Sequence, residues 1–113
     1  MKDLEYLAHI EGAILEMRSH TASMTQEQYE ADSKTQRAVE RNLQIIGDAS
    51  HKLSLALKTA HPEIPWDDVY GARNKVVHYY LGVNQKILWD IVQNDLGALL
   101  AKAQAILAGK GSC

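Results

Sequence analysis

The stretch that decides the fold is residues 33–60, which read SKTQRAVERNLQIIGDASHKLSLALKTA. Aliphatic side chains recur there at three- and four-residue steps, the repeat that places them on one face of an α-helix. These apolar positions are Ala38, Val39, Leu43, Ile46, Ala49, Leu53, Ala56 and Leu57. The pattern predicts one long helix that ends near Ala60, because His61-Pro62 stops it. Either Asp32 or Ser33 is its expected N-cap. If Ser33 is the cap, Gln36 is the N3 partner that completes a capping box.

Shorter segments with the same period lie upstream of this stretch. Residues 2–18 carry apolar side chains at helical spacing, namely Leu4, Leu7, Ile10, Ile14 and Met17. Thr25 followed by Gln28 matches a capping box and predicts a short helical turn through Tyr29.

Two more main helices are predicted downstream. Trp66-Asp67-Asp68 opens one that runs to about Tyr80, with carboxylates in the first turn where the helix dipole favours them. Asn84 caps the last helix, which ends near Gly109. Because no strand pattern is visible, we expect an all-α, up-and-down helical bundle of about four main helices plus a short extra helical turn.

Length and composition limit the class of protein. A chain of 113 residues with 46% hydrophobic content supports one folded domain, expected over residues 1–108, with residues 109–113 as a disordered tail. The apolar runs are too short to span a membrane, and the N-terminus lacks a signal-peptide pattern. Cys113 is the single cysteine. A cytoplasmic protein is therefore expected.

Charge narrows the choice of ligands. A net charge of −2 argues against a broad surface that coats nucleic acid, so any RNA must be held by a local basic cleft. Lys34, Arg37 and Arg41 form a short basic stripe, which is either a solvated face or a binding surface. The five histidines lack metal-ligand spacing, so no metal site and no cofactor is expected.

The reactive side chains gather in residues 71–83, GARNKVVHYYLGV. Arg73 is a permanent cation and His78 titrates near neutrality, a pair suited to a phosphodiester. The alternative is a surface arginine and a histidine near a helix end. On a continuous helix the two would be about 140° apart, whereas Asn74 and His78 would share a face.

Two positions of the long helix suggest contacts with this segment. Gly47 lowers helix stability by about 1 kcal/mol relative to alanine and admits a close neighbour, for which Trp66 is a candidate. Asp48 either faces water or pairs with a cation such as Arg73.

The motif of Arg73, Asn74, His78 and Tyr80 resembles the signature of the HEPN superfamily, in particular its HepT-like branch. Three further stretches share the resemblance, which covers about residues 38–107: residues 41–49 (RNLQIIGDA), residues 61–66 (HPEIPW), and Gly82-Val83 with residues 87–89 (ILW). Asp48 replaces the family's usual glutamate, Asn84 an acidic residue, and Ala72 a common methionine.

The resemblance implies a homodimeric, metal-independent endoribonuclease toxin of a toxin–antitoxin pair. Two copies of the motif would meet at the dimer interface. One His78 would accept the proton of a ribose 2′-hydroxyl, the other would protonate the leaving 5′-oxygen, and Arg73 would stabilise the transition state. Asn74 would orient the substrate or the imidazole, and Asp48 would keep a supporting polar role.

Control is also implied by the resemblance. Tyr80 corresponds to the tyrosine that a partner nucleotidyltransferase, the antitoxin, modifies with AMP, although the sequence does not distinguish it from Tyr79. Taken by itself, Tyr80 is either a base-stacking platform or core filler. A rival interpretation makes the chain a non-catalytic helical partner, or a substrate-presenting subunit, of a nucleotidyltransferase.

Overall fold

The computed structural model describes residues 2–78 and 82–109, with the backbone alone described at 73–78 and 82. Its helices are α1 (Lys2–Thr21), α2 (Gln26–Glu30), α3 (Ser33–Lys52), α4 (Leu55–Ala60), α5 (Trp66–Val76), α6 (Gln85–Asp90), the π-helical segment η1 (Ile91–Asp95) and α7 (Leu96–Gly109). Two short strands, β1 (Val77–His78) and β2 (Gly82–Val83), stand between α5 and α6.

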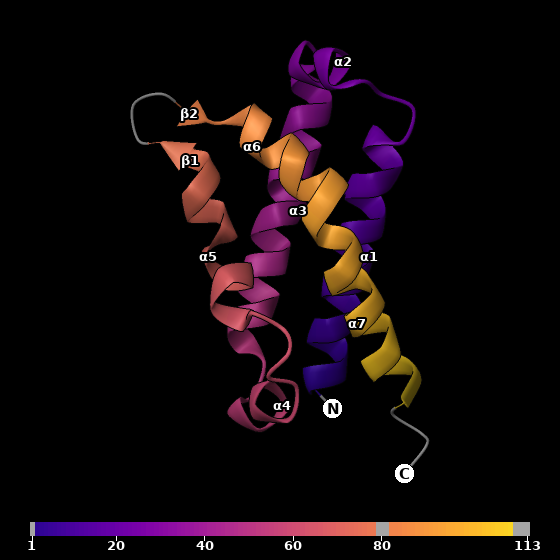
Figure 1. The fold of residues 1–113 in the computed structure, drawn as a ribbon, viewed down its shortest axis with the longest axis vertical. Helices are drawn as coiled ribbons and strands as arrows, with labels where there is room; N and C mark the ends of the chain where they lie inside the picture. Colours follow the sequence, from indigo (N-terminus) through magenta and orange to yellow (C-terminus); the bar gives the residue numbers. More distant parts are fainter. Residues whose placement is uncertain (1, 79–81, 110–113) are drawn as a thin grey trace.

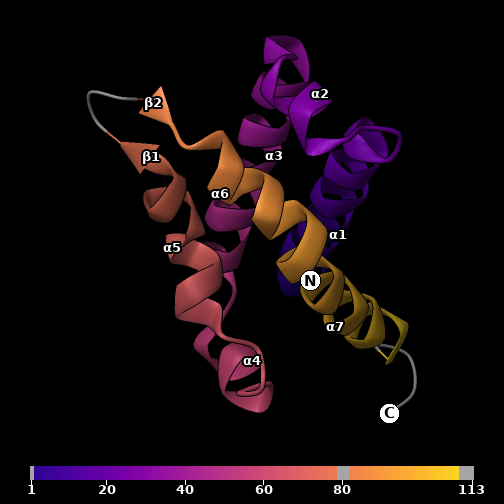
Figure 2. The same cartoon turned by 45° about the horizontal axis from the view of Figure 1, so that its top comes forward.

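The helices alternate in direction (Figure 1). α1 leaves the end of the molecule that holds both termini, α3 returns to it, α5 rises again, and α6, η1 and α7 descend as one helical run. α3 packs against α1 and against α5, and α7 packs against α1. The turned view places α5 and α1 on opposite sides of α3 (Figure 2). The predicted all-α up-and-down bundle is confirmed. No described helix has the length and apolarity needed to cross a membrane.

The core follows the helical spacing of the sequence. Apolar residues of α1, α3 and the α6–α7 run meet in its centre and are nearly inaccessible to solvent, among them Leu7, Ile10, Ile14, Met17, Val39, Leu43, Ile46, Leu88 and Val92. Burial of each large aliphatic side chain contributes about 1.5–3 kcal/mol. The apolar faces predicted from periodicity therefore hold the bundle together.

Local capping signals set several helix boundaries. The Thr25 capping box is present, since Gln28 N–H donates to Thr25 Oγ1 and Thr25 N–H donates to Gln28 Oε1. Asp32 rather than Ser33 caps α3, because its carboxylate accepts from Thr35 N–H at 3.1 Å. Asn84 caps α6 in the same way, through Ile87 N–H. These caps satisfy amide groups that the first turn leaves free.

The long helix predicted to reach Ala60 breaks at Leu53, and this prediction is wrong. Leu53 has extended backbone angles, and Ser54 caps the separate helix α4 through Leu57 N–H. Asp3 of α1 fixes the break, because it accepts from Ser54 N–H at 2.9 Å and from the Ser54 hydroxyl at 2.6 Å. A carboxylate far away in sequence thus stabilises a serine cap that competes with the continuous helix.

The helix predicted to run from Trp66 to about Tyr80 ends at Val76, and the expectation of no strands fails at the same place. Residues 77–78 pair antiparallel with residues 82–83, in the register Val77↔Val83 and His78↔Gly82. The adjacent β-branched residues Val76 and Val77 favour the extended conformation that pairing needs. A small hairpin therefore follows α5.

Candidate functional site

The sequence motif straddles the junction between α5 and the hairpin. Arg73 and Asn74 lie in the last turn of α5, and His78 lies in β1 opposite Gly82. The helical angle expected between Arg73 and His78, and the shared face expected for Asn74 and His78, do not apply, because His78 lies beyond the end of the helix. The backbone still brings the cation and the imidazole-bearing residue to one end of α5.

A close approach of two backbones sets the position of α5 on α3. A β-carbon at Gly47 would lie 3.6 Å from the backbone carbonyl oxygen of Tyr70. One turn further along α3, the His51 ring stacks on the Tyr70 ring, with centroids 4.5 Å apart. Gly47 thus admits a close neighbour as expected, but the neighbour is Tyr70 of α5 rather than Trp66.

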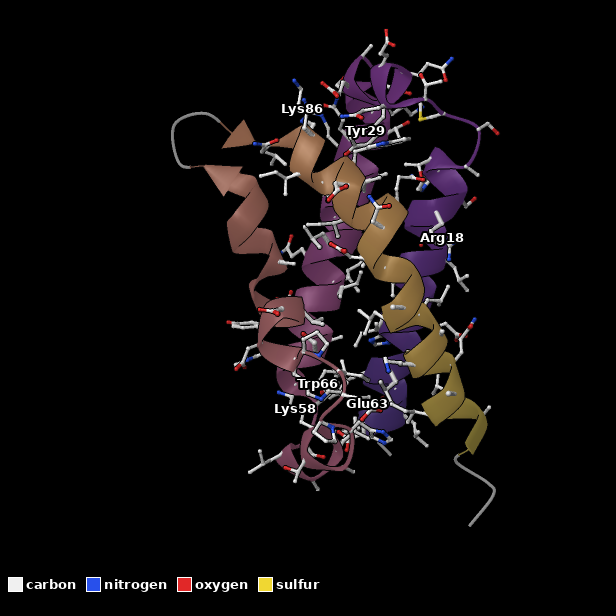
Figure 3. The ribbon with its side chains drawn as sticks, in the orientation of Figure 1. Arg18, Tyr29, Lys58, Glu63, Trp66 and Lys86 are labelled. Atoms are coloured by element: carbon white, nitrogen blue, oxygen red, sulfur yellow. The ribbon has the colours of Figure 1, made fainter. Side chains whose placement is uncertain are left out.

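Trp66 has a different role at the start of α5 (Figure 3). Its indole Nε1–H donates to the carbonyl oxygen of His61 at 3.0 Å, which closes the connector between α4 and α5. Ile64 in the same connector is buried. The N-terminal end of α5 is therefore anchored by Trp66 and Ile64, while its middle rests on Gly47.

Charged side chains of α3 lie near the same region. Lys34, Arg37, Arg41 and Asp48 are all exposed. Glu40, one residue before Arg41, accepts a hydrogen bond from Gln85 at the start of α6. Glu40 lies between Arg37 and Arg41 in the sequence, so the start of α6, which follows the hairpin, contacts the part of α3 that carries the basic stripe. The exposure of Asp48 is compatible with both alternatives, since an exposed carboxylate can face water or pair with a cation such as Arg73, whose side chain is not among those described.

An apolar groove of about 420 Å³ separates α5 from the α6–α7 run. Its apolar lining includes Leu43, Ile46, Ala72, Ile87, Ile91 and Leu99, and its charged lining consists of Asp68, Asp90, Asp95 and Lys102. Three carboxylates against one ammonium group repel phosphate. The groove is therefore a poor place for RNA.

The remaining site predictions concern residues that carry no description here. Tyr80, the expected AMP acceptor, and Tyr79, its competitor for that role, lie outside the described residues. Within the described part of the chain, no three His, Cys, Asp or Glu side chains gather in a way that could hold a metal ion.

Comparison with known proteins identifies the class. Residues 10–106 of this chain match the model of the family described as "Ribonuclease HepT-like". A protein of Thermococcus cleftensis named "Probable ribonuclease HepT" is 38% identical over 102 residues, which cover 90% of this chain and 93% of that protein. The "Putative RNase TTE0752" of Caldanaerobacter subterraneus is 30% identical over 102 residues, covering 90% and 91%. No solved structure matches.

The chain therefore belongs to the HepT-like ribonuclease family. Arg73, Asn74, Asp48, His78 and Tyr80 all fall inside the matched segment.

Proposed function

We propose that this protein is a metal-independent endoribonuclease that acts as the toxin of a toxin–antitoxin pair. The observation that carries the proposal is the family match over residues 10–106, which includes both Arg73 and His78. The relatives' printed names describe them as ribonucleases. The position of Arg73 and His78 at one end of α5 is consistent with a shared phosphate site.

The reaction is an internal transfer at phosphorus. The His78 imidazole of one subunit removes the proton from a ribose 2′-hydroxyl, and the 2′-oxygen then forms a bond to the adjacent phosphorus. The bond from phosphorus to the 5′-oxygen breaks, and that oxygen takes a proton from the second subunit's imidazolium. Arg73 stabilises the charge on the phosphoryl oxygens in the transition state. The products end in a 2′,3′-cyclic phosphate and a 5′-hydroxyl.

A homodimer supplies the two imidazoles that this scheme requires. The hairpin that carries His78 projects at one corner of the bundle (Figure 1), and the apolar groove runs beside the same α5 helix. A two-fold axis near the end of α5 would bring both hairpins together. The exposed stripe of Lys34, Arg37 and Arg41 would then flank the cleft and contact phosphates of the bound strand.

Control acts at Tyr80. A partner nucleotidyltransferase, the antitoxin, binds ATP with magnesium, and the Tyr80 phenol oxygen forms a bond to the α-phosphorus. The bond to the β-phosphate breaks, pyrophosphate leaves, and the phenolic proton passes to solvent. The attached AMP places an anionic phosphate within reach of Arg73 and His78 and silences the ribonuclease.

The decisive experiment measures cleavage of total cellular RNA and, once a cut site is mapped, of a short single-stranded RNA that contains it. His78→Ala and Arg73→Ala should each lower the rate by about a hundredfold or more, the usual loss for an acid–base or charge-stabilising group. His9→Ala and Arg18→Ala change exposed residues of α1 and are matched controls that should keep wild-type rates.

Two conditions test the chemistry itself. EDTA should leave the wild-type rate unchanged, and a 2′-deoxy substitution at the cut site should block cleavage. A His78→Ala protein that cuts at the wild-type rate, or cleavage of the 2′-deoxy substrate, would refute the mechanism. Circular dichroism confirms that each variant is folded.

A further inference from the structure

A partly buried pair of hydrogen bonds links three helices close to the point where the chain leaves the hairpin and enters α6. The Tyr29 hydroxyl of α2 donates to Gln85 Oε1 at 2.6 Å, and Gln85 Nε2–H donates to Glu40 Oε2 of α3 at 2.6 Å. Tyr29 is fully buried, and its ring packs on Trp89 with centroids 5.3 Å apart. Figure 3 shows Tyr29 between α2 and the start of α6. None of these residues belongs to the Arg73–His78 motif.

The two hydrogen bonds run in one direction, from Tyr29 through Gln85 to Glu40, because the Glu40 carboxylate cannot donate. A carboxylate only accepts, so the amide nitrogen of Gln85 must face Glu40 and its oxygen must face Tyr29. Burial, with a further contribution from the charge of Glu40, raises the pKa of the Tyr29 hydroxyl. The phenol therefore keeps its proton at neutral pH and remains a hydrogen-bond donor. The Gln85 amide is thus hydrogen-bonded on both sides, by Tyr29 and by Glu40.

Gln85 is two residues beyond the end of β2. Asn84, between them, caps α6, so little slack separates Gln85 from Val83. Because β2 pairs with β1 in the register His78↔Gly82, the position of Gln85 on α3 also sets the position of the His78 backbone. A ladder of two residues per strand is too short to be stable by itself, so its placement depends on what holds its ends.

We propose that Gln85, with Glu40 and Tyr29, is a positioning residue that anchors the chain just after β2 to α3 and α2 and so sets the position of the His78 backbone for catalysis. α5 holds the first end of the hairpin through its contact at Gly47, and the Tyr29–Gln85–Glu40 chain holds the second end. The expected effect on catalysis rests on the proposed ribonuclease function. The anchoring of the hairpin by Gln85 can be measured without RNA.

Exchanging the polar groups tests the link. Gln85→Glu keeps the size of the side chain but opposes two carboxylates, so the hydrogen bond to Glu40 is lost. Glu40→Gln leaves an oxygen that still accepts from Gln85 and should have little effect. The double variant Gln85→Glu/Glu40→Gln re-forms a satisfied chain, since the new carboxylate accepts both from the Tyr29 hydroxyl and from the amide at position 40. Gln104→Glu, on the exposed face of α7, is the matched control.

The first measurement is amide hydrogen exchange at residues 77–84, together with the ring resonances of His78 by NMR. Loss of a partner from a buried polar group shifts a local equilibrium by about tenfold or more, so exchange should quicken by that factor in Gln85→Glu. In the Glu40→Gln, Gln85→Glu/Glu40→Gln and Gln104→Glu variants, the exchange rates of these amides should stay within about threefold of the wild-type rates. Tyr29→Phe keeps the buried ring and removes only the hydrogen bond to Gln85, so it tests the same link by amide exchange if Gln85→Glu does not fold.

The second measurement is RNA cleavage well below the melting temperature. A misplacement of about 1 Å can lower a rate by about a hundredfold, so kcat of Gln85→Glu should fall at least about tenfold with KM nearly unchanged. A role limited to overall stability would lower Tm and leave kcat intact. The double variant should recover kcat.

Unchanged exchange and unchanged kcat in a folded Gln85→Glu protein would overturn the proposal, and so would a double variant that recovers neither. If the wild type cuts no RNA, the proposed function fails. The exchange data still decide whether Gln85 positions the hairpin.

Discussion

Replacing Gly47 by alanine should stabilise the protein, even though Gly47 is buried between α3 and α5. The added β-carbon would lie 3.6 Å from the Tyr70 carbonyl oxygen, which is an ordinary van der Waals separation. Nothing needs to move, so the gain in helix propensity remains, about 1 kcal/mol. For a domain of this size that gain raises Tm by about 4 °C.

The assay is urea unfolding followed by far-UV circular dichroism, at one fixed protein concentration because a dimer's stability depends on it. Gly12→Ala is the matched control, since Gly12 lies inside α1 and has no atom within 4 Å of an added β-carbon. The two variants should gain similar stability. Gly47→Leu should instead lose about 1–3 kcal/mol, because its next carbons would run into the backbone of α5.

A loss of stability in Gly47→Ala beside a gain in Gly12→Ala would refute the reasoning, because it would mean that the added β-carbon meets the Tyr70 carbonyl oxygen at less than 3.6 Å. A neutral Gly47→Leu would equally refute it, since α5 would then not rest on this position. Either outcome would also mean that α5, the helix that carries Arg73, is placed differently on α3.

Three further predictions concern acid stability, assembly and control. Hydrogen bonds from the Ser54 side chain and backbone lower the pKa of Asp3, so its stabilising effect is complete above the ordinary carboxyl pKa of about 3.9 and is lost as pH falls through the lower folded-state value. Unfolding free energies of wild type and Asp3→Asn should therefore differ at pH 7 and converge in acid, and a constant difference down to pH 2 would contradict this. Sedimentation should show a dimer at micromolar concentration, and an active monomer would refute the two-histidine scheme. Co-expression with a nucleotidyltransferase antitoxin should add whole AMP masses that map to Tyr80 and are absent in Tyr80→Phe; inhibition without any adduct would exclude this control.

Local signals explain why so much of the fold was predictable. The Thr25 box and the Asp32 and Asn84 caps each act over three residues, so the partners are visible in the sequence. The apolar faces of α1 and α3 likewise repeat within the helix that they define. The hairpin after α5 was missed, although the β-branched pair Val76-Val77 was a signal that could have indicated it.

Two other errors have a different physical cause, which is contact with partners distant in the sequence. The Ser54 cap at the break before α4 is hydrogen-bonded to Asp3, which is 51 residues away. Gly47 was correctly interpreted as a place of close approach, but the approaching group is the Tyr70 backbone and not the large Trp66 side chain. Every residue has a backbone carbonyl, so residue type does not indicate which carbonyl will approach Gly47.

The sequence by itself determined the apolar faces of the main helices, the Thr25 and Asn84 caps and the chemical groups at the candidate site, because residue type and short spacing are sufficient for each. Arg73 and His78 were identified by residue type and interval together with the resemblance of the surrounding stretches to the HepT-like branch. Only the tertiary structure decided that His78 stands on a strand and that Gln85 is held by Tyr29 and Glu40, partners 56 and 45 residues away. Such contacts arise when packed helices bring remote side chains within hydrogen-bond distance, and no local pattern encodes which ones will meet.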